Sequence, residues 1–230
     1  MEPTPPTHLS EYAEKSLQAL AREGLGHKIS LGGALGLQHY HEYRTTHDVD
    51  AWWHDSASAE DRARVLAVIE ETLRSWGDVR ARRWGEVVSL DLRVGNRTVF
   101  NFQIATRSAL LASPTRVPWA DVALDSFPDL VASKMVALVE RGAPRDFLDI
   151  YTVCHAELVT ASGCWDLWRQ RQRLAGSDAD SRRARLAIET HLIRIAQHRP
   201  LDEIPEPEQR AEAERLRNWF QKEFLDALVD

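Results

Sequence analysis

The sequence predicts an α+β protein, in which a mixed sheet flanked by helices is followed by a C-terminal helical region. Three observations support this. A short apolar strand at 29–31 leads through a Gly-Gly turn and a helical segment to a second strand opened by Asp48. Two segments with alternating apolar and polar residues, 88–94 and 99–104, form a hairpin pattern. From residue 126 onward, apolar residues recur at helical spacing.

Four segments are expected in chain order. They are 1–26 for a Pro-rich leader and a helix, 27–125 for the sheet-containing core, 126–155 for a pair of helices, and 156–230 for the C-terminal helical region.

Within these segments, Ser10 is the expected N-cap of the first helix, and Gly24 ends it. A helix at 59–76 has a broad apolar stripe that would cover the sheet, and 119–125 is expected to be irregular.

Composition narrows the protein class. The 230 residues are 43% hydrophobic and 28% charged, which is ordinary for a globular protein. No apolar run approaches the roughly 18 residues that cross a membrane, and the N-terminus lacks signal-peptide features, so a cytoplasmic protein is expected. The net charge of -6 argues against nucleic-acid binding over the whole surface. Cys154 and Cys164 match no zinc spacing and are expected to be free thiols.

Asp48 and Asp50 are two residues apart at the start of a strand, so both carboxylates point to the same side. Mg²⁺ prefers one or two carboxylates together with substrate phosphates, so this pair is a candidate magnesium site. Gly32 and Gly33 lie upstream, where the missing Cβ atoms let backbone N–H groups approach an anion such as a phosphate. The pattern therefore places a phosphate-binding turn close to a metal-binding pair.

The hairpin pattern also predicts a register. A two-residue loop at 95–96 would set Leu90 opposite Asn101 and mix the two faces of the sheet. A three-residue loop that ends at Arg97 keeps the apolar residues on one face, so it is the expected loop. This register puts Asp91 beside Asn101.

A second group of charged residues lies in the expected helix pair. Lys134 and Arg141 share one helix face, and Asp146 and Asp149 are three residues apart on the next helix. The two cations suit a triphosphate. The alternative is an ion-pair network that holds the two helices together.

Both groups resemble motifs of the AbiEii/AbiGii nucleotidyltransferase toxin family, within the superfamily of DNA polymerase β-like nucleotidyltransferases. The resemblance covers residues 27–153. The first motif is carried by Gly32, Gly33, Ala34, Leu35, Arg44, Asp48 and Asp50, and the second by 133–141 and 144–150.

The resemblance implies transfer of a nucleoside monophosphate from an NTP to an acceptor hydroxyl, in several relatives at the 3′ end of tRNA. It also implies Mg²⁺ as cofactor and a cognate antitoxin as partner, in a toxin–antitoxin or phage-defence pair. No membrane partner is expected.

The resemblance also assigns roles to individual residues. Asp48 and Asp50 would hold Mg²⁺, and Lys134 would meet the triphosphate. Asp146 would orient Lys134 or Arg141 or contact the nucleotide. The remaining nucleotide-binding candidates are Gly32, Gly33, Arg44 and Arg141, although Arg44 could instead anchor the loop before Asp48.

A third carboxylate on a neighbouring strand is usual in this type of transfer, but the expected position is Asn101. An asparagine brings no charge and cannot act as a base. We therefore expect Asp91 to supply the carboxylate from across the hairpin. The alternative is that Asp91 is a solvated strand residue.

Two other functions remain compatible with the sequence. A nucleotide-binding protein of the same fold that has lost transfer activity would explain Asn101. A small-molecule nucleotidyltransferase, like the antibiotic-modifying enzymes, would use the C-terminal helices as its acceptor pocket, and the net negative charge would attract a cationic acceptor.

Overall fold

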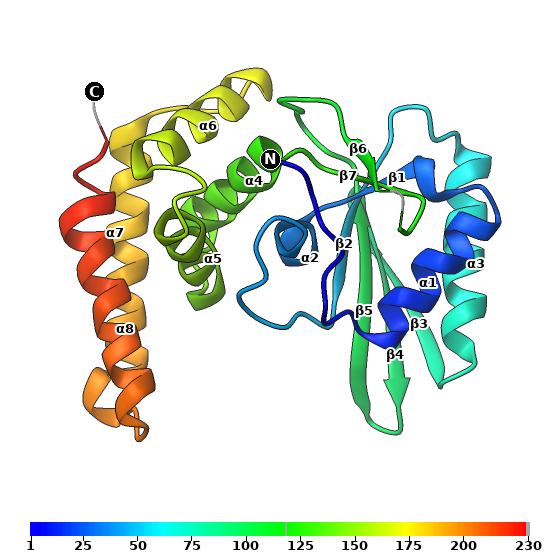
Figure 1. The fold of residues 1–230 in the computed structure, drawn as a ribbon, viewed down its shortest axis with the longest axis horizontal. Coiled ribbons are helices and arrows are strands. Elements are labelled where there is room, and N and C mark those ends of the chain that lie inside the picture. Colours follow the sequence, from blue (N-terminus) through cyan, green and yellow to red (C-terminus); the bar gives the residue numbers. More distant parts are fainter. Residues whose placement is uncertain (118, 229–230) are drawn as a thin grey trace. The chain divides into compact units, whose positions relative to one another are not determined.

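The computed structural model describes residues 1–117 and 119–228. The chain divides into two compact units, Met1–Leu130 and Val131–Asp230. Figure 1 shows strands and helices in the first unit and helices in the second.

Within the described residues, one sheet of seven strands organises the first unit, in the order β3-β4-β5-β2-β1-β7-β6. The strands are β1 (Ile29–Leu31), β2 (Val49–Trp53), β3 (Asp78–Trp84), β4 (Val87–Val94), β5 (Arg97–Ala105), β6 (Thr115–Val117) and β7 (Val122–Leu124). The pairs β2/β5 and β1/β7 are parallel and the other pairs are antiparallel, so the sheet is mixed. The expected α+β class with a mixed sheet is confirmed.

The hairpin between β4 and β5 has the expected facing residues but a different turn. Asp91 pairs with Asn101, and Leu90 pairs with Phe102. However, Val94 pairs with Arg97, so the turn contains only residues 95–96, and the expected three-residue loop is wrong. A register shift next to Leu92, in the ladder between Phe100 and Thr98, restores the buried face.

Three strands were absent from the sequence prediction. β3 is exposed along almost its whole length, so it lacks the alternation that marks a half-buried strand. β6 and β7 have three residues each, and β7 lies in the 119–125 segment that was expected to be irregular.

Among the described residues of the first unit, the α-helices α1 (Glu11–Arg22), α2 (Gly33–Gln38) and α3 (Ala59–Arg74) lie beside the sheet. The Ser10 hydroxyl accepts a hydrogen bond from the Ala13 amide, as expected of the N-cap. In Figure 1, α1 and α3 lie on one side of the sheet and α2 lies on the other. The apolar core contains residues of α1, α3 and the sheet, among them Leu17, Leu20, Val65, Ile69, Leu73, Leu90, Leu92, Phe100 and Phe102. One face of the sheet is therefore apolar and covered, which leaves the other for polar side chains.

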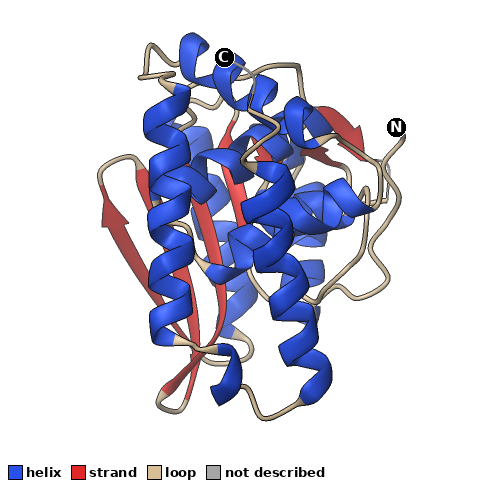
Figure 2. Cartoon of the chain, turned by 90° about the vertical axis from the view of Figure 1, so that its left-hand side faces the viewer, coloured by secondary structure: helices blue, strands red, loops and turns tan. Residues whose placement is uncertain are grey.

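Helices build the second unit (Figure 2). They are α4 (Phe127–Glu140), which begins in the first unit, α5 (Pro144–His155), α6 (Ala161–Leu174), α7 (Ser181–His198) and α8 (Pro207–Trp219). A short π-helical segment, Phe220–Phe224, follows α8. The Phe224 ring packs on Trp165, whose indole N–H donates to the Phe224 carbonyl at 3.0 Å.

The two cysteines are free thiols, as expected, with sulfur atoms 3.6 Å apart. A search of the described helices found none with the length and apolar character needed to cross a bilayer.

Candidate functional site

Two rows of polar residues cross the sheet of the first unit. In the first row, Asp50 of β2 pairs with Gln103 of β5, which pairs with Ser89 of β4, which pairs with Arg82 of β3. Residues that pair directly across strands point to the same face of a sheet. The candidate carboxylate therefore shares its face with a polar row that extends to the edge strand.

The second row begins at Asp48, just before β2. The backbone N–H of Asn101 donates to Asp48 Oδ1 at 3.1 Å, and Asn101 pairs with Asp91, which pairs with Arg80. Asp48 is exposed and Asp50 is half-buried. The two carboxylates of the expected magnesium site are thus at the start of a central strand, with Asp48 open to solvent.

The Gly32-Gly33 turn lies directly against this site. Gly33 has φ +58°, a left-handed conformation that favours glycine, and a Cβ there would overlap the Asp50 carboxylate. A Cβ at Gly32 would overlap the indole of Trp52. The Gly32 N–H donates to the Asp50 carbonyl at 2.8 Å. The glycines are therefore required because Asp50 and Trp52 pack against the turn.

Asp91 is buried and is held by several partners. Its carboxylate is 5% exposed and lies 2.6 Å from the Arg82 guanidinium. It also accepts hydrogen bonds from the Ser89 hydroxyl at 2.9 Å and from the Asn101 side-chain amide. Asp91 is therefore not a solvated strand residue.

The structure does not bring Asp91 into one cluster with Asp48 and Asp50. Nowhere in residues 1–117 and 119–228 do three His, Cys, Asp or Glu side chains form a group that could hold a metal ion. Two strand spacings, about 10 Å, separate the backbone of β4 from that of β2. Asn101, on β5 between these two strands, instead links Asp48 and Asp91. Its backbone N–H donates to Asp48, and its side-chain amide donates to Asp91.

Arg44 lies in the loop between α2 and β2 and is half-buried. Its guanidinium lies 5.7 Å from the centre of the Tyr43 ring, and its backbone carbonyl accepts a hydrogen bond from the Gln38 side chain. Both contacts order the loop that precedes Asp48.

The second motif forms two ion pairs in the second unit. Lys134 Nζ lies 2.6 Å from Asp149 Oδ2, and these side chains are 9% and 0% exposed. Arg141 makes two parallel hydrogen bonds of 2.8 Å to the Asp146 carboxylate. Asp146 also accepts the Ala143 amide at the start of α5. The ion-pair network considered from the sequence is present.

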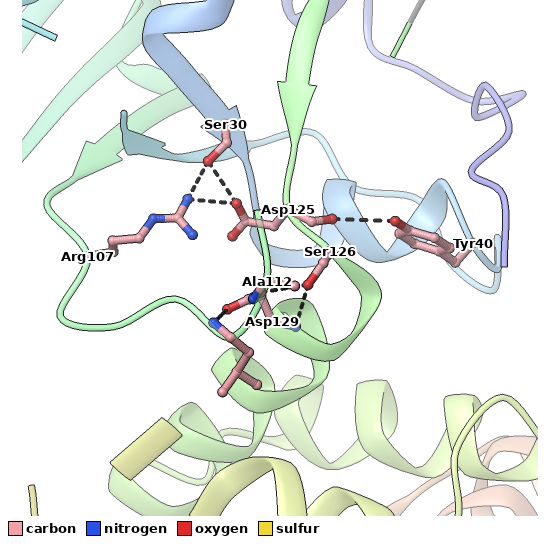
Figure 3. A network of polar contacts seen from close by, with 8 residues as sticks. Ser30, Tyr40, Arg107, Ala112, Asp125, Ser126 and Asp129 are labelled. Carbon is pink, nitrogen blue, oxygen red and sulfur yellow. Dashed lines mark hydrogen bonds and ion pairs between the residues drawn. The ribbon is translucent and has the colours of Figure 1, made fainter. Parts of the chain in front are cut away.

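A buried polar network next to the Gly-Gly turn was missed by sequence reasoning (Figure 3). Arg107 and Ser30 converge on Asp125, with 2.7 Å between Arg107 Nη2 and Asp125 Oδ1. Burial raises the pKa of Asp125, and the positive charge of Arg107 opposes this effect. Arg107 also lies 5.8 Å from the centre of the Trp52 ring, the same indole that packs on Gly32.

A second buried carboxylate, Asp129, orders the loop after β5 (Figure 3). It accepts hydrogen bonds from the amides of Leu111 and Ala112 at 2.7 and 2.9 Å, and from the Ser126 hydroxyl at 2.6 Å. Leu111 and Ala112 are distant from Asp129 in sequence, so no local pattern indicates these two contacts, whereas Ser126 lies three residues before Asp129.

Comparisons with known proteins identify the family. The family model described as "Nucleotidyl transferase AbiEii toxin, Type IV TA system" matches residues 15–230. No curated protein matches.

Among solved structures, JHP933 from Helicobacter pylori is similar with a TM-score of 0.51 and 17% identity, over 95% of this chain and 96% of that chain. A solution structure of the antibiotic-resistance factor ANT(2'')-Ia is similar with a TM-score of 0.47 and 11% identity, over 81% and 92% of the two chains. The first of these likenesses supports the fold.

The family match spans nearly the whole chain and includes both motifs, which shows the family and the activity that its description names. It also implies an NTP substrate and a cognate antitoxin. The protein is a nucleotidyltransferase and belongs to the AbiEii toxin family.

Proposed function

We propose that the polar face of the first unit is the transfer site, and that it moves a nucleoside monophosphate from an NTP to the 3′ hydroxyl of tRNA. The observation that carries the proposal is the contact between the Gly32-Gly33 turn and Asp50, with Asp48 beside it. In the reaction, the acceptor oxygen bonds to the α-phosphorus, the α–β phosphoanhydride bond breaks, and pyrophosphate leaves.

The donor set suits Mg²⁺. Asp48 and Asp50 offer hard carboxylate oxygens at the start of one strand, and a magnesium site completed by substrate phosphates needs no more than one or two carboxylates. When bound, the ion would polarise the phosphates and offset the charge that develops in the transition state. We assign Asp48 and Asp50 to hold it.

The turn would position the triphosphate. Because the Gly32 amide already donates to the Asp50 carbonyl, we assign the phosphate contact to the Gly33 side of the turn. Arg44, in the loop before Asp48, would add a cation that can bind two phosphate oxygens at once.

Lys134, Arg141 and Asp146 are proposed to act from the second unit. A lysine ammonium has three donors, so Lys134 can keep its bond to Asp149 and still donate to a phosphate. The Arg141 side chain is 66% exposed, and Asp146 fixes its direction through two hydrogen bonds. We therefore assign Asp146 as a positioning residue for Arg141.

Asp91 is proposed to act through Asn101. It accepts a hydrogen bond from the Asn101 side-chain amide and so fixes Asn101, whose backbone N–H donates to Asp48. Its own carboxylate is balanced by Arg82, so it is poorly placed to take the acceptor proton. We infer that this proton leaves to solvent.

The test is incubation of the purified protein with Mg²⁺, each α-labelled NTP in turn and total tRNA, beside an Asp48→Asn/Asp50→Asn variant. The proposal expects label in RNA with the wild-type protein only, released by treatment that trims the 3′ end. An Asp55→Asn variant, which changes an exposed aspartate outside the site, is the matched control. Transfer that persists in the double variant, or that goes to small alcohols and amines instead of RNA, would contradict the proposal.

A further inference from the structure

The second unit contains a cavity that none of the assigned roles uses. It has a volume of about 460 Å³ and lies between α5, α7 and α8, which Figure 1 labels. Ligand sites for small molecules have volumes of about 300 to 1,000 Å³. Its apolar lining includes Phe147, Leu148, Leu192, Ile195, Ile204 and Leu216.

The way α8 is held explains why the cavity exists. Near its start, the Arg210 guanidinium donates two hydrogen bonds to the Ile204 carbonyl, at 3.0 and 2.7 Å. Just beyond its end, Phe220 packs edge-to-face on Phe147, with ring centres 4.8 Å apart. Between these two attachments α8 presents Ala213 to the cavity, where a small side chain leaves the space open.

The charged residues of the lining are mainly cationic. Arg145, Arg199 and Arg217 line the cavity, and Glu212 is its one carboxylate among the described residues. Within the described part of the chain, none of these four side chains forms an ion pair. The lining therefore has three cationic side chains against one carboxylate, which is an excess of positive charge.

Local structure increases this excess. Arg145 is in the first turn of α5, next to the positive end of the helix dipole, where a cation is unfavourable. The Arg217 guanidinium donates to the backbone carbonyl of Arg199 at 2.6 Å, which holds the Arg217 side chain next to residue 199. Burial, and then the charge of Arg199, lower the pKa of Arg217. An anion at this position would relieve the repulsion.

We propose that this cavity binds a small amphipathic organic anion, with its carboxylate or phosphate on Arg199 and Arg217 and its apolar body against Phe147, Leu192 and Leu216. Arginine matches both anionic groups through two parallel hydrogen bonds. A cationic ligand would meet like charge. The proposal is independent of nucleotidyl transfer, because it concerns only side chains of the second unit.

The experiment is a fluorescence titration of the full chain with anilinonaphthalene sulfonate, an apolar aromatic body with one anionic group. Wild-type protein should bind the probe saturably. Arg199→Gln/Arg217→Gln should weaken binding by about tenfold or more, because two charge-assisted contacts are lost. The matched control, Arg194→Gln/Arg215→Gln, removes the same charge from arginines outside this lining and should leave binding unchanged.

Ala213→Phe fills the cavity while keeping the arginines, and should abolish saturable binding. Ala211→Phe, on the same helix but outside the lining, is its control. If a variant does not fold by circular dichroism, competition on the wild-type protein decides.

In that competition, decanoate or AMP should displace the probe and decylamine should not. Displacement by decanoate identifies an aliphatic carboxylate as the ligand class, and displacement by AMP identifies a nucleoside phosphate. The proposal would be overturned by any of three results. Decylamine could displace the probe as effectively as the anions do, the arginine variant could bind the probe as tightly as the wild-type protein, or the wild-type protein could show no saturable binding.

Discussion

Two pairs of aspartates have opposite surroundings in this protein. Asp48 and Asp50 start a central strand of the first unit, one exposed and one half-buried. Asp146 and Asp149 of the second unit are both 0% exposed, and each pairs with a cation of the preceding helix. The difference teaches which carboxylates can bind a ligand. A buried carboxylate with a fixed counter-charge stabilises its own helix pair, whereas an exposed one keeps lone pairs for a metal ion.

The largest effect on folding is expected at Asp149. Asp149→Asn leaves Lys134 buried beside a neutral partner, so we expect a loss of about 3 to 5 kcal/mol in the free energy of unfolding. Urea unfolding of the purified variant measures this. Lys134→Met/Asp149→Leu, which removes both charges, should recover most of the loss. A loss below about 1 kcal/mol for Asp149→Asn would place this pair in the same class as Asp48 and Asp50.

A smaller effect is expected at the turn. Gly33→Ala puts an alanine in a left-handed backbone conformation, which lowers the free energy of unfolding by about 1 to 2 kcal/mol. Its Cβ also displaces the Asp50 carboxylate. Gly85→Ala is the matched control, because Gly85 has φ +53° and no atom within 4 Å of an added Cβ. The transfer rate should therefore fall in Gly33→Ala and not in Gly85→Ala. Equal rates would show that the position of Asp50 against the turn is unimportant.

Asp91 is a buried carboxylate on β4, two strands away from Asp48 and Asp50. Its substitution tests whether it assists transfer at that pair. Asp91→Asn removes the partner of Arg82 and loosens Asn101, so turnover should fall by about tenfold, while the KM for NTP stays constant. Steady-state kinetics of transfer measure both quantities. A fall of a thousandfold, with lost Mg²⁺ dependence, would instead make Asp91 the third metal ligand.

The smallest effect is expected at Glu42, which anchors the leader segment. The pKa of Glu42 is lowered from 4.5 to about 2, chiefly because its carboxylate accepts hydrogen bonds from the hydroxyl and the amide of Thr7. Because the folded-state pKa is below the unfolded value, this stabilisation is present above about pH 4.5 and is lost as the pH falls through about 2. Glu42→Gln should cost less than about 1 kcal/mol at pH 7, and less at pH 2 than at pH 7, by thermal unfolding at both values.

The fold class and the position of the acidic pair could be predicted from the sequence because they depend on local spacing. Alternation alone set Leu90 opposite Phe102 and Asp91 opposite Asn101. The length of the turn could not be predicted in the same way, because an irregular register next to Leu92 corrects the faces without a local signal.

Contacts between distant segments were beyond sequence reasoning. Arg107 meets Ser30 and Asp125 only after β1 and β7 pair, and each residue alone is an ordinary polar side chain. Lys134 and Arg141 were identified because helical spacing puts them on one face, but their burial and their aspartate partners depend on how α4 and α5 pack. Long-range packing, not local pattern, decides these features.

The most direct test of the difference between the two aspartate pairs measures nucleotidyl transfer and the free energy of unfolding in two double variants. In Asp48→Asn/Asp50→Asn, we expect labelled-NTP transfer to fall at least about a hundredfold, while the free energy of unfolding changes by less than about 1 kcal/mol. In Asp146→Asn/Asp149→Asn, we expect a loss of several kcal/mol in that free energy. Undiminished transfer in the first variant, or unchanged stability in the second, would contradict the division between a catalytic pair that is open to solvent at Asp48 and a buried supporting pair.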